Sequence, residues 1–273
     1  MDKKLIVLGI ESSCDDTSAA ILKGSNVLSN IISSQDIHKQ YGGVVPELAS
    51  RAHQQNIIPV VDTAIKSAKI NRSDIDVIAY TKGPGLLGSL LVGSSFAKSF
   101  SYSLRRPLVS VNHMKAHILA HFIEDEKNSS PDFPFICLTV SGGHTQIVLV
   151  NSFTEMKIIG TTLDDAAGEA FDKSAKVLGL DYPGGPLIDK FSKSGNINAF
   201  TFGKPKIKEL DFSFSGLKTS IMNKINSSLM TNPKFIDKNL NDLCASIQHS
   251  IIRILLDKVE KAIIKTKVKS VAI

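Results

Sequence analysis

The sequence has few cysteines and no long apolar run, and each shortage excludes a class of protein. Its 273 residues include three cysteines, Cys14, Cys137 and Cys244, whose odd number and wide spacing exclude a disulfide framework and a zinc knuckle. The uncharged stretch 83–97 is too short to span a bilayer and contains glycine and proline. No signal peptide or amphipathic presequence comes before the first apolar run. The sequence therefore predicts a cytoplasmic protein with reduced thiols and no membrane segment.

Charge is unevenly distributed along the chain, which has a net charge of +6. Residues 1–199 hold 19 Lys and Arg against 20 Asp and Glu, whereas residues 200–273 hold 13 against 6. A basic C-terminal part suits a polyanion such as RNA. A solvated, lysine-rich helix face explains the same numbers equally well, so charge alone does not identify a partner.

Apolar residues, at 42% of the composition, are arranged in a pattern that repeats once. Three strands come first in each half, joined by short turns, and helices follow. In the first half, strands are expected at 4–10, 17–22, 27–32, 75–81 and 108–111, with helices at 46–68 and 89–104. In the second half, strands are expected at 135–140, 145–150 and 157–161, with helices at 165–178, 186–194, 215–225 and 240–265. The pattern predicts an α/β chain with two similar lobes.

The predicted division is a first lobe at 1–112, a histidine-bearing helix and connection at 113–134, and a second lobe at 135–273. In the first lobe the strand at 75–81 leads into a glycine loop and another helix. The matching apolar run in the second lobe, 268–273, is the last segment of the sequence. We therefore expect the second lobe to be incomplete at its C-terminal end.

Two histidines, His113 and His117, are four residues apart on a predicted helix, so both imidazoles project from one face within reach of one metal ion. Two such ligands leave room for a carboxylate and for substrate. An isolated pair at this spacing is more often incidental than a metal site. No glutamate follows His113, which disfavours the zinc protease signature H-E-x-x-H. His121 lies further round the helix and is expected at the surface or in the core.

Turns between the paired strands are the second feature that points to chemistry. Ser141, Gly142, Gly143 and His144 form a turn whose backbone N–H groups could approach an anion, although a plain hairpin turn is the alternative. Its counterpart, residues 11–16, carries Glu11 and two aspartates, which would repel a phosphate unless a cation or water intervened. Together the two turns predict nucleotide binding in a cleft between the lobes.

Carboxylates of the second lobe are further candidates. Asp165, Glu169 and Asp172 are spaced to share one helix face, although Asp164 and Asp165 are explained as partners of the helix dipole. Residues 182–189 form a stiff turn into a helix, with glycines for close approach and Asp189 as a possible hydrogen-bond acceptor.

These segments, taken together and in this order, resemble the bacterial TsaD family of tRNA threonylcarbamoyladenosine transferases, formerly called glycoproteases. The resemblance runs from residue 5 to the last residue and does not depend on one motif. The segments that carry it are 9–17 (GIESSCDDT), 42–53 (GGVVPELASRAH), 83–86 (GPGL), 112–117 (NHMKAH), 140–145 (VSGGHT), 163–173 (LDDAAGEAFDK) and 182–186 (YPGGP).

The resemblance implies a duplicated actin/Hsp70-like (ribonuclease-H-like) fold and a reaction. The threonylcarbamoyl group of threonylcarbamoyl-AMP would move to the exocyclic amine of the adenosine 3′ of the anticodon, in tRNAs that read ANN codons, with release of AMP. One divalent metal ion, iron in preference to zinc, would be held by His113 and His117. No general base is assigned. The substrate-binding residues implied are Val140, Ser141, Gly142, Gly143, His144, Asp172, Gly185 and Asp189, with Glu11 as a possible phosphate-side carboxylate.

Partners follow from the same resemblance: tRNA, threonylcarbamoyl-AMP, a TsaB-like paralogue and a TsaE-like ATPase. TsaB resembles the first lobe but lacks the histidine pair, so the pair favours the catalytic member. The family continues past the segment matching 268–273 with a glycine-rich loop, a substrate-binding asparagine and an aspartate that completes the metal site. The alternatives are an inactive fragment that serves only as a partner-binding module of the TsaB type and, ranked lower, a metalloprotease.

Overall fold

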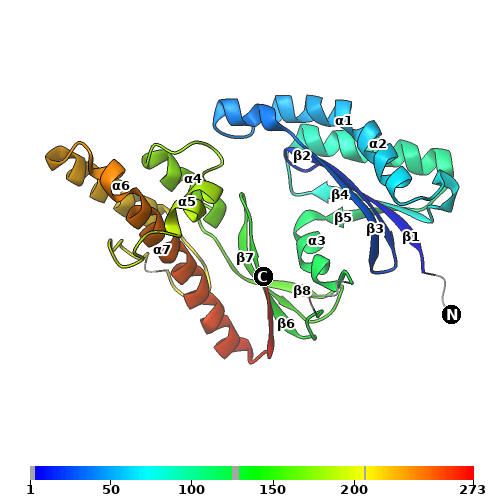
Figure 1. The fold of residues 1–273 in the computed structure, drawn as a ribbon. Helices are drawn as coiled ribbons and strands as arrows, with labels where there is room; N and C mark the ends of the chain where they lie inside the picture. Colours follow the sequence, from blue (N-terminus) through cyan, green and yellow to red (C-terminus); the bar gives the residue numbers. More distant parts are fainter. Residues whose placement is uncertain (1–3, 125–128, 206) are drawn as a thin grey trace. The chain divides into compact units, whose positions relative to one another are not determined.

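Two β-sheets organise the chain in this computed structural model, which describes residues 4–124, 129–205 and 207–273 (Figure 1). Each sheet belongs to one of two units, Met1–Ser130 and Pro131–Ile273. The helix α3 (His113–Leu119), which carries the histidine pair, falls in the first unit.

The first unit contains a five-stranded sheet in the order β3-β2-β1-β4-β5. Tight turns allow β1, β2 and β3 to pair antiparallel, whereas β4 and β5 join in parallel after helical crossovers. Its strands are β1 (Ile6–Glu11), β2 (Asp16–Lys23), β3 (Asn26–Ser34), β4 (Val77–Gly83) and β5 (Leu108–Asn112).

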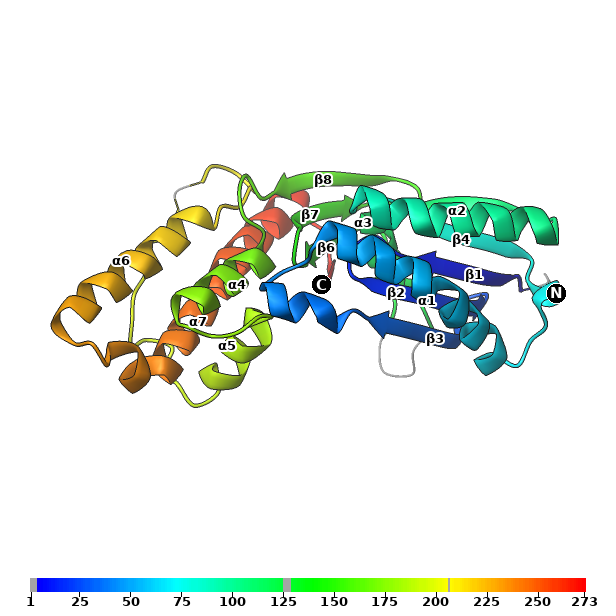
Figure 2. The ribbon, with the colours of Figure 1, turned by 90° about the horizontal axis from the view of Figure 1, so that it is seen from above.

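Two helices, α1 (Pro46–Ser67) and α2 (Leu87–Leu104), pack on one face of this sheet (Figure 2). Alternate strand residues such as Leu8 and Ile21 meet residues of α1 one turn apart, such as Ile57 and Val61. The helix α3 packs beside β4 and β5. Short 3₁₀ helices complete the unit: η1 (Asp36–Tyr41), η2 (Arg72–Asp74) and η3 (Ala120–Phe122), which contains the half-buried His121.

The second unit repeats the same strand arrangement. Its order is β8-β7-β6-β9; β6, β7 and β8 are antiparallel, and β9 is parallel to β6 as β4 is to β1. The strands are β6 (Phe135–Val140), β7 (Thr145–Val150), β8 (Met156–Thr161) and β9 (Ser270–Ala272). The predicted duplication is therefore confirmed in strand order and direction.

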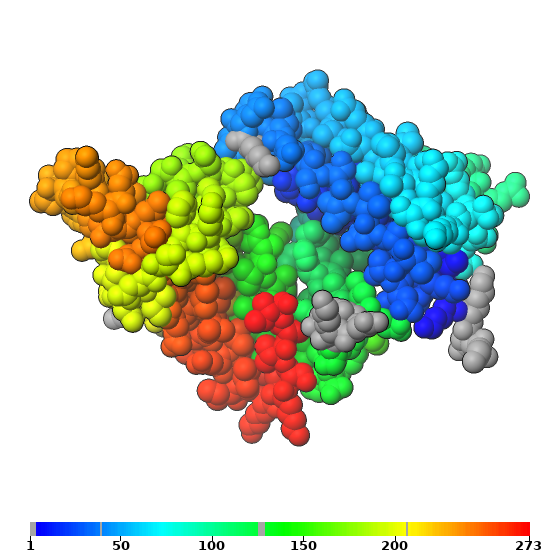
Figure 3. Space-filling model, viewed as in Figure 1, coloured from blue at the N-terminus to red at the C-terminus, as the bar shows by residue number. Residues whose placement is uncertain are grey.

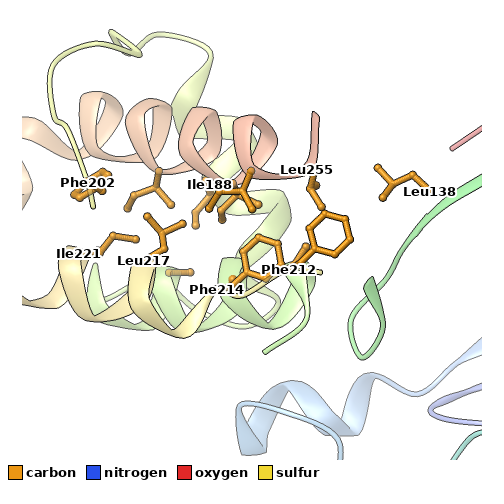
Figure 4. Close-up of a cluster of buried hydrophobic side chains, with 14 of the residues drawn as sticks. Leu138, Ile188, Phe202, Phe212, Phe214, Leu217, Ile221 and Leu255 are labelled. Atoms are coloured by element: carbon orange, nitrogen blue, oxygen red, sulfur yellow. The ribbon is translucent and has the colours of Figure 1, made fainter. Parts of the chain in front are cut away.

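Four helices accompany the second sheet: α4 (Ala167–Val177), α5 (Gly184–Ser192), α6 (Ser215–Thr231) and α7 (Phe235–Thr266). They enclose an apolar core that includes Ile188, Phe214 and Leu217, all fully buried (Figure 4). The backbone of α7 leaves helical geometry at Asn239, whose side chain donates to the carbonyl of Phe235 at 2.7 Å. The predicted helix at 240–265 corresponds to the part beyond this break.

One difference from the expected helix starts affects the candidate site. α4 begins at Ala167, so Asp165 precedes the helix and does not share a helical face with Glu169 and Asp172. The cause is local: Ala166 is extended, and the N–H of Ala167 donates to the Thr145 hydroxyl at 2.8 Å. Asp165 forms an ion pair with Lys173 instead.

Among the described residues, no helix combines the length and the apolar character that crossing a membrane requires.

Candidate active site

The two histidines of the first unit converge at the start of α3. Asn112 caps this helix by accepting a hydrogen bond from the N–H of Lys115 at 3.1 Å. The Nε2 atoms of His113 and His117 are 3.1 Å apart, and the rings meet edge to face with centroids 4.6 Å apart. Two nitrogen ligands at about 2.0–2.1 Å from a tetrahedral ion are roughly 3.3 Å apart, so the spacing fits a shared metal ion.

Glu11, the last residue of β1, lies on the other side of His113. Its Oε2 atom is 3.2 Å from Nδ1 of His113 and accepts from the Thr81 hydroxyl, while Oε1 accepts from the N–H of Ser13. Burial alone would raise the pKa of Glu11, but the hydrogen bonds from His113, Ser13 and Thr81 outweigh it and lower the pKa to about 2. An ionised carboxylate here holds a proton on Nδ1, which leaves Nε2 of His113 as a ligand.

These residues would supply only part of a metal site. Within residues 4–124, 129–205 and 207–273, no group of three or more His, Cys, Asp or Glu side chains is arranged to hold an ion. Glu11 contacts the Nδ1 side of His113, so it could orient this ring as a ligand but does not face the same space as the two Nε2 atoms. The two imidazole nitrogens are suitable as two of the ligands of an iron or zinc ion.

The turn that follows Glu11 is held from beneath by groups that the sequence did not single out. His53, fully buried on α1, has Nδ1 2.7 Å from the Thr17 hydroxyl and Nε2 3.0 Å from the carbonyl oxygen of Cys14. Ser12 donates to the carbonyl of Ser89 at 2.9 Å. The only sequence signal was that His53 ends one of the segments that carry the family resemblance.

A cavity of about 500 Å³ opens beside the histidine pair within the first unit. Glu11, His113 and His117 supply charged and polar groups to its wall, and small residues of three neighbouring strands line another part of it: Gly9, Ala20 and Ala79. The site therefore combines polar ligands with an apolar recess.

In the second unit, the glycine turn between β6 and β7 is open to solvent. The N–H of Ser141 donates to the carbonyl of His144 at 2.9 Å, and the N–H of His144 donates back to the Ser141 hydroxyl at 3.1 Å. Gly142 and Gly143 are exposed, and a Cβ on either would meet nothing within 4 Å. No described residue accepts from their N–H groups, which can therefore donate to an anion.

The N-terminus of α4 packs against this turn. The N–H of Gly168 donates to the carbonyl of Ser141 at 3.2 Å, and a Cβ on Gly168 would lie 2.7 Å from that oxygen. Only glycine permits this approach without a shift of the turn. Val140, at the end of β6, is partly exposed beside it.

Asp172 holds the start of α5. One of its oxygens accepts from the N–H of Gly184 at 2.8 Å and of Gly185 at 3.4 Å, as an N-cap would. Asp189, further along α5, lies 3.4 Å from the ammonium of Lys193 and accepts from the Gln248 amide at 3.3 Å. Asp172 thus has a structural role besides the substrate contact expected of it.

Asp164, which the sequence explained as a dipole partner, joins two segments. It accepts from the N–H groups of Phe214 at 2.7 Å and Ser215 at 3.3 Å, and from the hydroxyls of Ser213 and Ser215. Burial would raise the pKa of Asp164, but these hydrogen bonds lower it overall. Nothing in the spacing of the sequence links Asp164 to residues fifty positions later.

The fold is the duplicated α/β fold of the actin/Hsp70 class. A solved structure of component A of (R)-2-hydroxyglutaryl-CoA dehydratase from Acidaminococcus fermentans matches it with a TM-score of 0.51 and 16% identity, covering 98% of this chain and 81% of that one. At this identity the likeness concerns the fold alone.

Other proteins are much more similar to this chain in sequence than that solved structure is. Residues 26–273 match the TsaD family, tRNA N6-adenosine threonylcarbamoyltransferase. Relatives described by that name are 61% identical in Riemerella anatipestifer, covering 99% of this chain and 80% of the relative, and 57% identical in Porphyromonas gingivalis, covering 100% and 81%. The chain belongs to the TsaD family of tRNA N6-adenosine threonylcarbamoyltransferases.

Proposed function

We propose that this chain transfers the threonylcarbamoyl group from threonylcarbamoyl-AMP to the exocyclic amine of the adenosine 3′ of the anticodon, in tRNAs that read ANN codons. The observation that carries the proposal is the convergence of His113 and His117 with Glu11 behind His113. Family membership over the whole chain supports the same reaction.

In this reaction the amine nitrogen attacks the carbamoyl carbon, the bond from that carbon to the phosphate oxygen breaks, and AMP leaves with the bonding electron pair. The amine loses one proton; no residue is assigned to accept it. A metal ion held by His113 and His117, iron in preference to zinc, would supply Lewis acid chemistry at the carbonyl and phosphate oxygens. Glu11 keeps the Nδ1 proton on His113 and fixes the ring that presents Nε2.

The glycine turn supplies the second set of contacts. We infer that the N–H groups of Gly142 and Gly143 donate to the phosphate or carbonyl oxygens of the acyl-adenylate, with Val140, Ser141 and His144 lining the same turn. Asp172 and Asp189 would accept from ribose or threonyl hydroxyls, and Gly185 would allow the backbone to approach the ligand closely.

The test is a reconstituted reaction with the purified chain, its partner proteins, threonylcarbamoyl-AMP and unmodified tRNA. Modified nucleoside is quantified by mass spectrometry after nuclease digestion. Removing one of two ligands should lower the rate by about a hundredfold or more, so His113→Ala and His117→Ala should both be nearly inactive. His121→Ala, a histidine of the neighbouring 3₁₀ helix η3, is the matched control and should retain activity.

Full activity of both histidine variants would contradict the assigned metal ligands. No product with the wild-type chain, combined with unchanged complex formation, would favour the alternative of a partner-binding module.

We also propose that α1 and α2 bind the TsaB-like paralogue. Leu87, Leu91 and Tyr102 share one face of α2 and, with Ile58 of α1, each expose more than half of their surface. Leu91→Lys should abolish complex formation in size-exclusion chromatography, whereas Met230→Lys, at an even more exposed position in the second unit, should not. Equal binding by both variants would contradict the proposed surface. The TsaE-like ATPase is a proposed partner without an assigned surface.

A further inference from the structure

One segment of the second unit contains no carboxylate. Between Asp211 and Asp237, residues 212–236 include no Asp or Glu, whereas they include three lysines, Lys218, Lys224 and Lys234. This segment comprises the whole of α6 and the turn into α7. Within this stretch, the positive charge of the C-terminal part of the chain is therefore not balanced by any carboxylate side chain.

The structure shows which side of α6 faces solvent. Leu217, Ile221 and Ile225 are buried, and they lie on one side of the helix. The opposite side carries Thr219, Asn223 and Asn226, which are exposed and lie at helical spacings of four and three. The space-filling view shows α6, in orange, on the exterior of the unit (Figure 3). A stripe of hydroxyl and amide groups therefore runs along the exposed face.

Lysines flank this stripe. Helical geometry places Lys218 on one flank of the buried side and Lys224 on the other, with Lys234 just before α7. The face is therefore bordered by positive charge on both sides.

These lysines differ from several others in the same unit. Lys173, Lys193, Lys204 and Lys265 each form an ion pair with an aspartate or glutamate. Lys218, Lys224 and Lys234 form none with any residue in the described part of the chain. Their charge is not neutralised by the protein itself and is available to a ligand.

We infer that this exposed face of α6, with Lys218, Lys224 and Lys234, binds the phosphate backbone of the RNA substrate. The inference rests on the proposed transferase function. Lysines attract phosphates, and hydroxyl and amide side chains donate to phosphate and sugar oxygens without reading sequence. The absence of carboxylates removes the repulsion that a phosphate backbone would otherwise meet. At 1.5 Å per residue, α6 is about 25 Å long, which is enough to contact several consecutive phosphates.

The experiment measures the dissociation constant of an unmodified tRNA transcript by fluorescence anisotropy over a range of KCl concentrations. The test variant is K218E/K224E/K234E. The control is K23E/K69E/K98E, which changes the same number of charges at exposed lysines of the first unit. Circular dichroism melting of each variant confirms that it folds, and K218R/K224R/K234R should retain wild-type affinity.

The test variant should bind tRNA about tenfold or more weakly than wild type, and the slope of log Kd against log salt should fall by about two. The control should change affinity by less than about threefold, since distant charges are screened. If the test variant binds tRNA as tightly as wild type does, the assignment of this surface to RNA is wrong, but the proposed transferase function is not affected. A wild-type chain that binds no tRNA would overturn the proposed function as well. Poly-glutamate that displaces tRNA at equal charge concentration would assign the face to an acidic protein partner and overturn the RNA assignment.

Discussion

The Oε2 atom of Glu11 lies 3.2 Å from Nδ1 of His113, while Nε2 of the same ring faces His117. A carboxylate in this position orients a histidine ligand and increases its basicity. Glu11→Gln keeps the shape of the side chain but removes the charge. We expect metal affinity to fall by about 10- to 100-fold, measured by titration against a competing chelator.

The matched control for Glu11 is Asp16→Asn, which removes an exposed carboxylate at the other end of the same turn. It should leave metal affinity nearly unchanged. Equal loss in both variants would indicate a general effect of negative charge and would contradict the orienting role of Glu11.

His53 is the buried support of the acidic turn. Replacement by alanine removes a partner from the Thr17 hydroxyl and the Cys14 carbonyl and leaves a cavity under the turn. We expect the free energy of unfolding to fall by about 2–4 kcal/mol. Urea unfolding followed by circular dichroism measures it. The exposed neighbour Gln54→Ala should change the same quantity by less than about 0.5 kcal/mol, and a similar result for His53→Ala would contradict the supporting role.

Asp164 predicts a pH dependence. Its folded-state pKa is lowered, so its contribution to stability is complete above the ordinary aspartate pKa of about 4 and is lost as the pH falls through the lower folded value. Asp164→Asn should cost about 1 kcal/mol near neutral pH, because the carboxylate holds the start of α6. The difference between wild type and variant, from urea unfolding at several pH values, should shrink below pH about 4. A difference that stays constant down to pH about 2 would contradict the assignment.

Gly168 predicts a steric effect on the glycine turn. Alanine at this position would bring a methyl group to 2.7 Å from the Ser141 carbonyl, so the turn must move. We expect destabilisation by about 1–3 kcal/mol and a raised KM for threonylcarbamoyl-AMP. At Gly216 on α6 a Cβ would be 3.8 Å from Pro205, so Gly216→Ala should be neutral or slightly stabilising. Unchanged KM in Gly168→Ala would argue against a ligand role for the turn.

Cys14 should react slowly despite its exposure at the acidic turn. Partial burial of the thiol and the charges of Asp15 and Asp16 raise its pKa to about 12. The thiolate fraction at pH 8 is then at least about a hundredfold below that of an ordinary cysteine, and iodoacetamide labelling, followed by mass spectrometry, should be slower in proportion. Asp15→Asn should accelerate labelling. Labelling of wild-type Cys14 as fast as free cysteine would contradict the raised pKa.

Most strands and helices of this chain could be predicted from apolar periodicity, because each buries one regular face. The strands β6 and β7 begin and end where the sequence indicated, and the main part of α7 does too. Less regular starts could not be predicted: α4 begins two residues later than expected because the Thr145 hydroxyl takes the N–H of Ala167.

The geometry of the candidate site was predictable only where two of its residues are neighbours along the chain. His113 and His117 are one helical turn apart, so spacing alone put them together. The contact of Glu11 with His113 spans about a hundred residues, and that of Asp164 with Phe214 spans fifty. Such contacts depend on which strands pair and where loops return, which periodicity does not encode.

The equivalent hairpins β1–β2 and β6–β7 have one last consequence. Glu11 pairs with Ser18 at the end of one hairpin, and Val140 pairs with Thr145 at the end of the other. The loop beyond is rich in carboxylates in one copy and in glycine in the other. After an ancestral duplication, each loop could thus diverge toward its own chemistry while the ladder beneath it stayed the same.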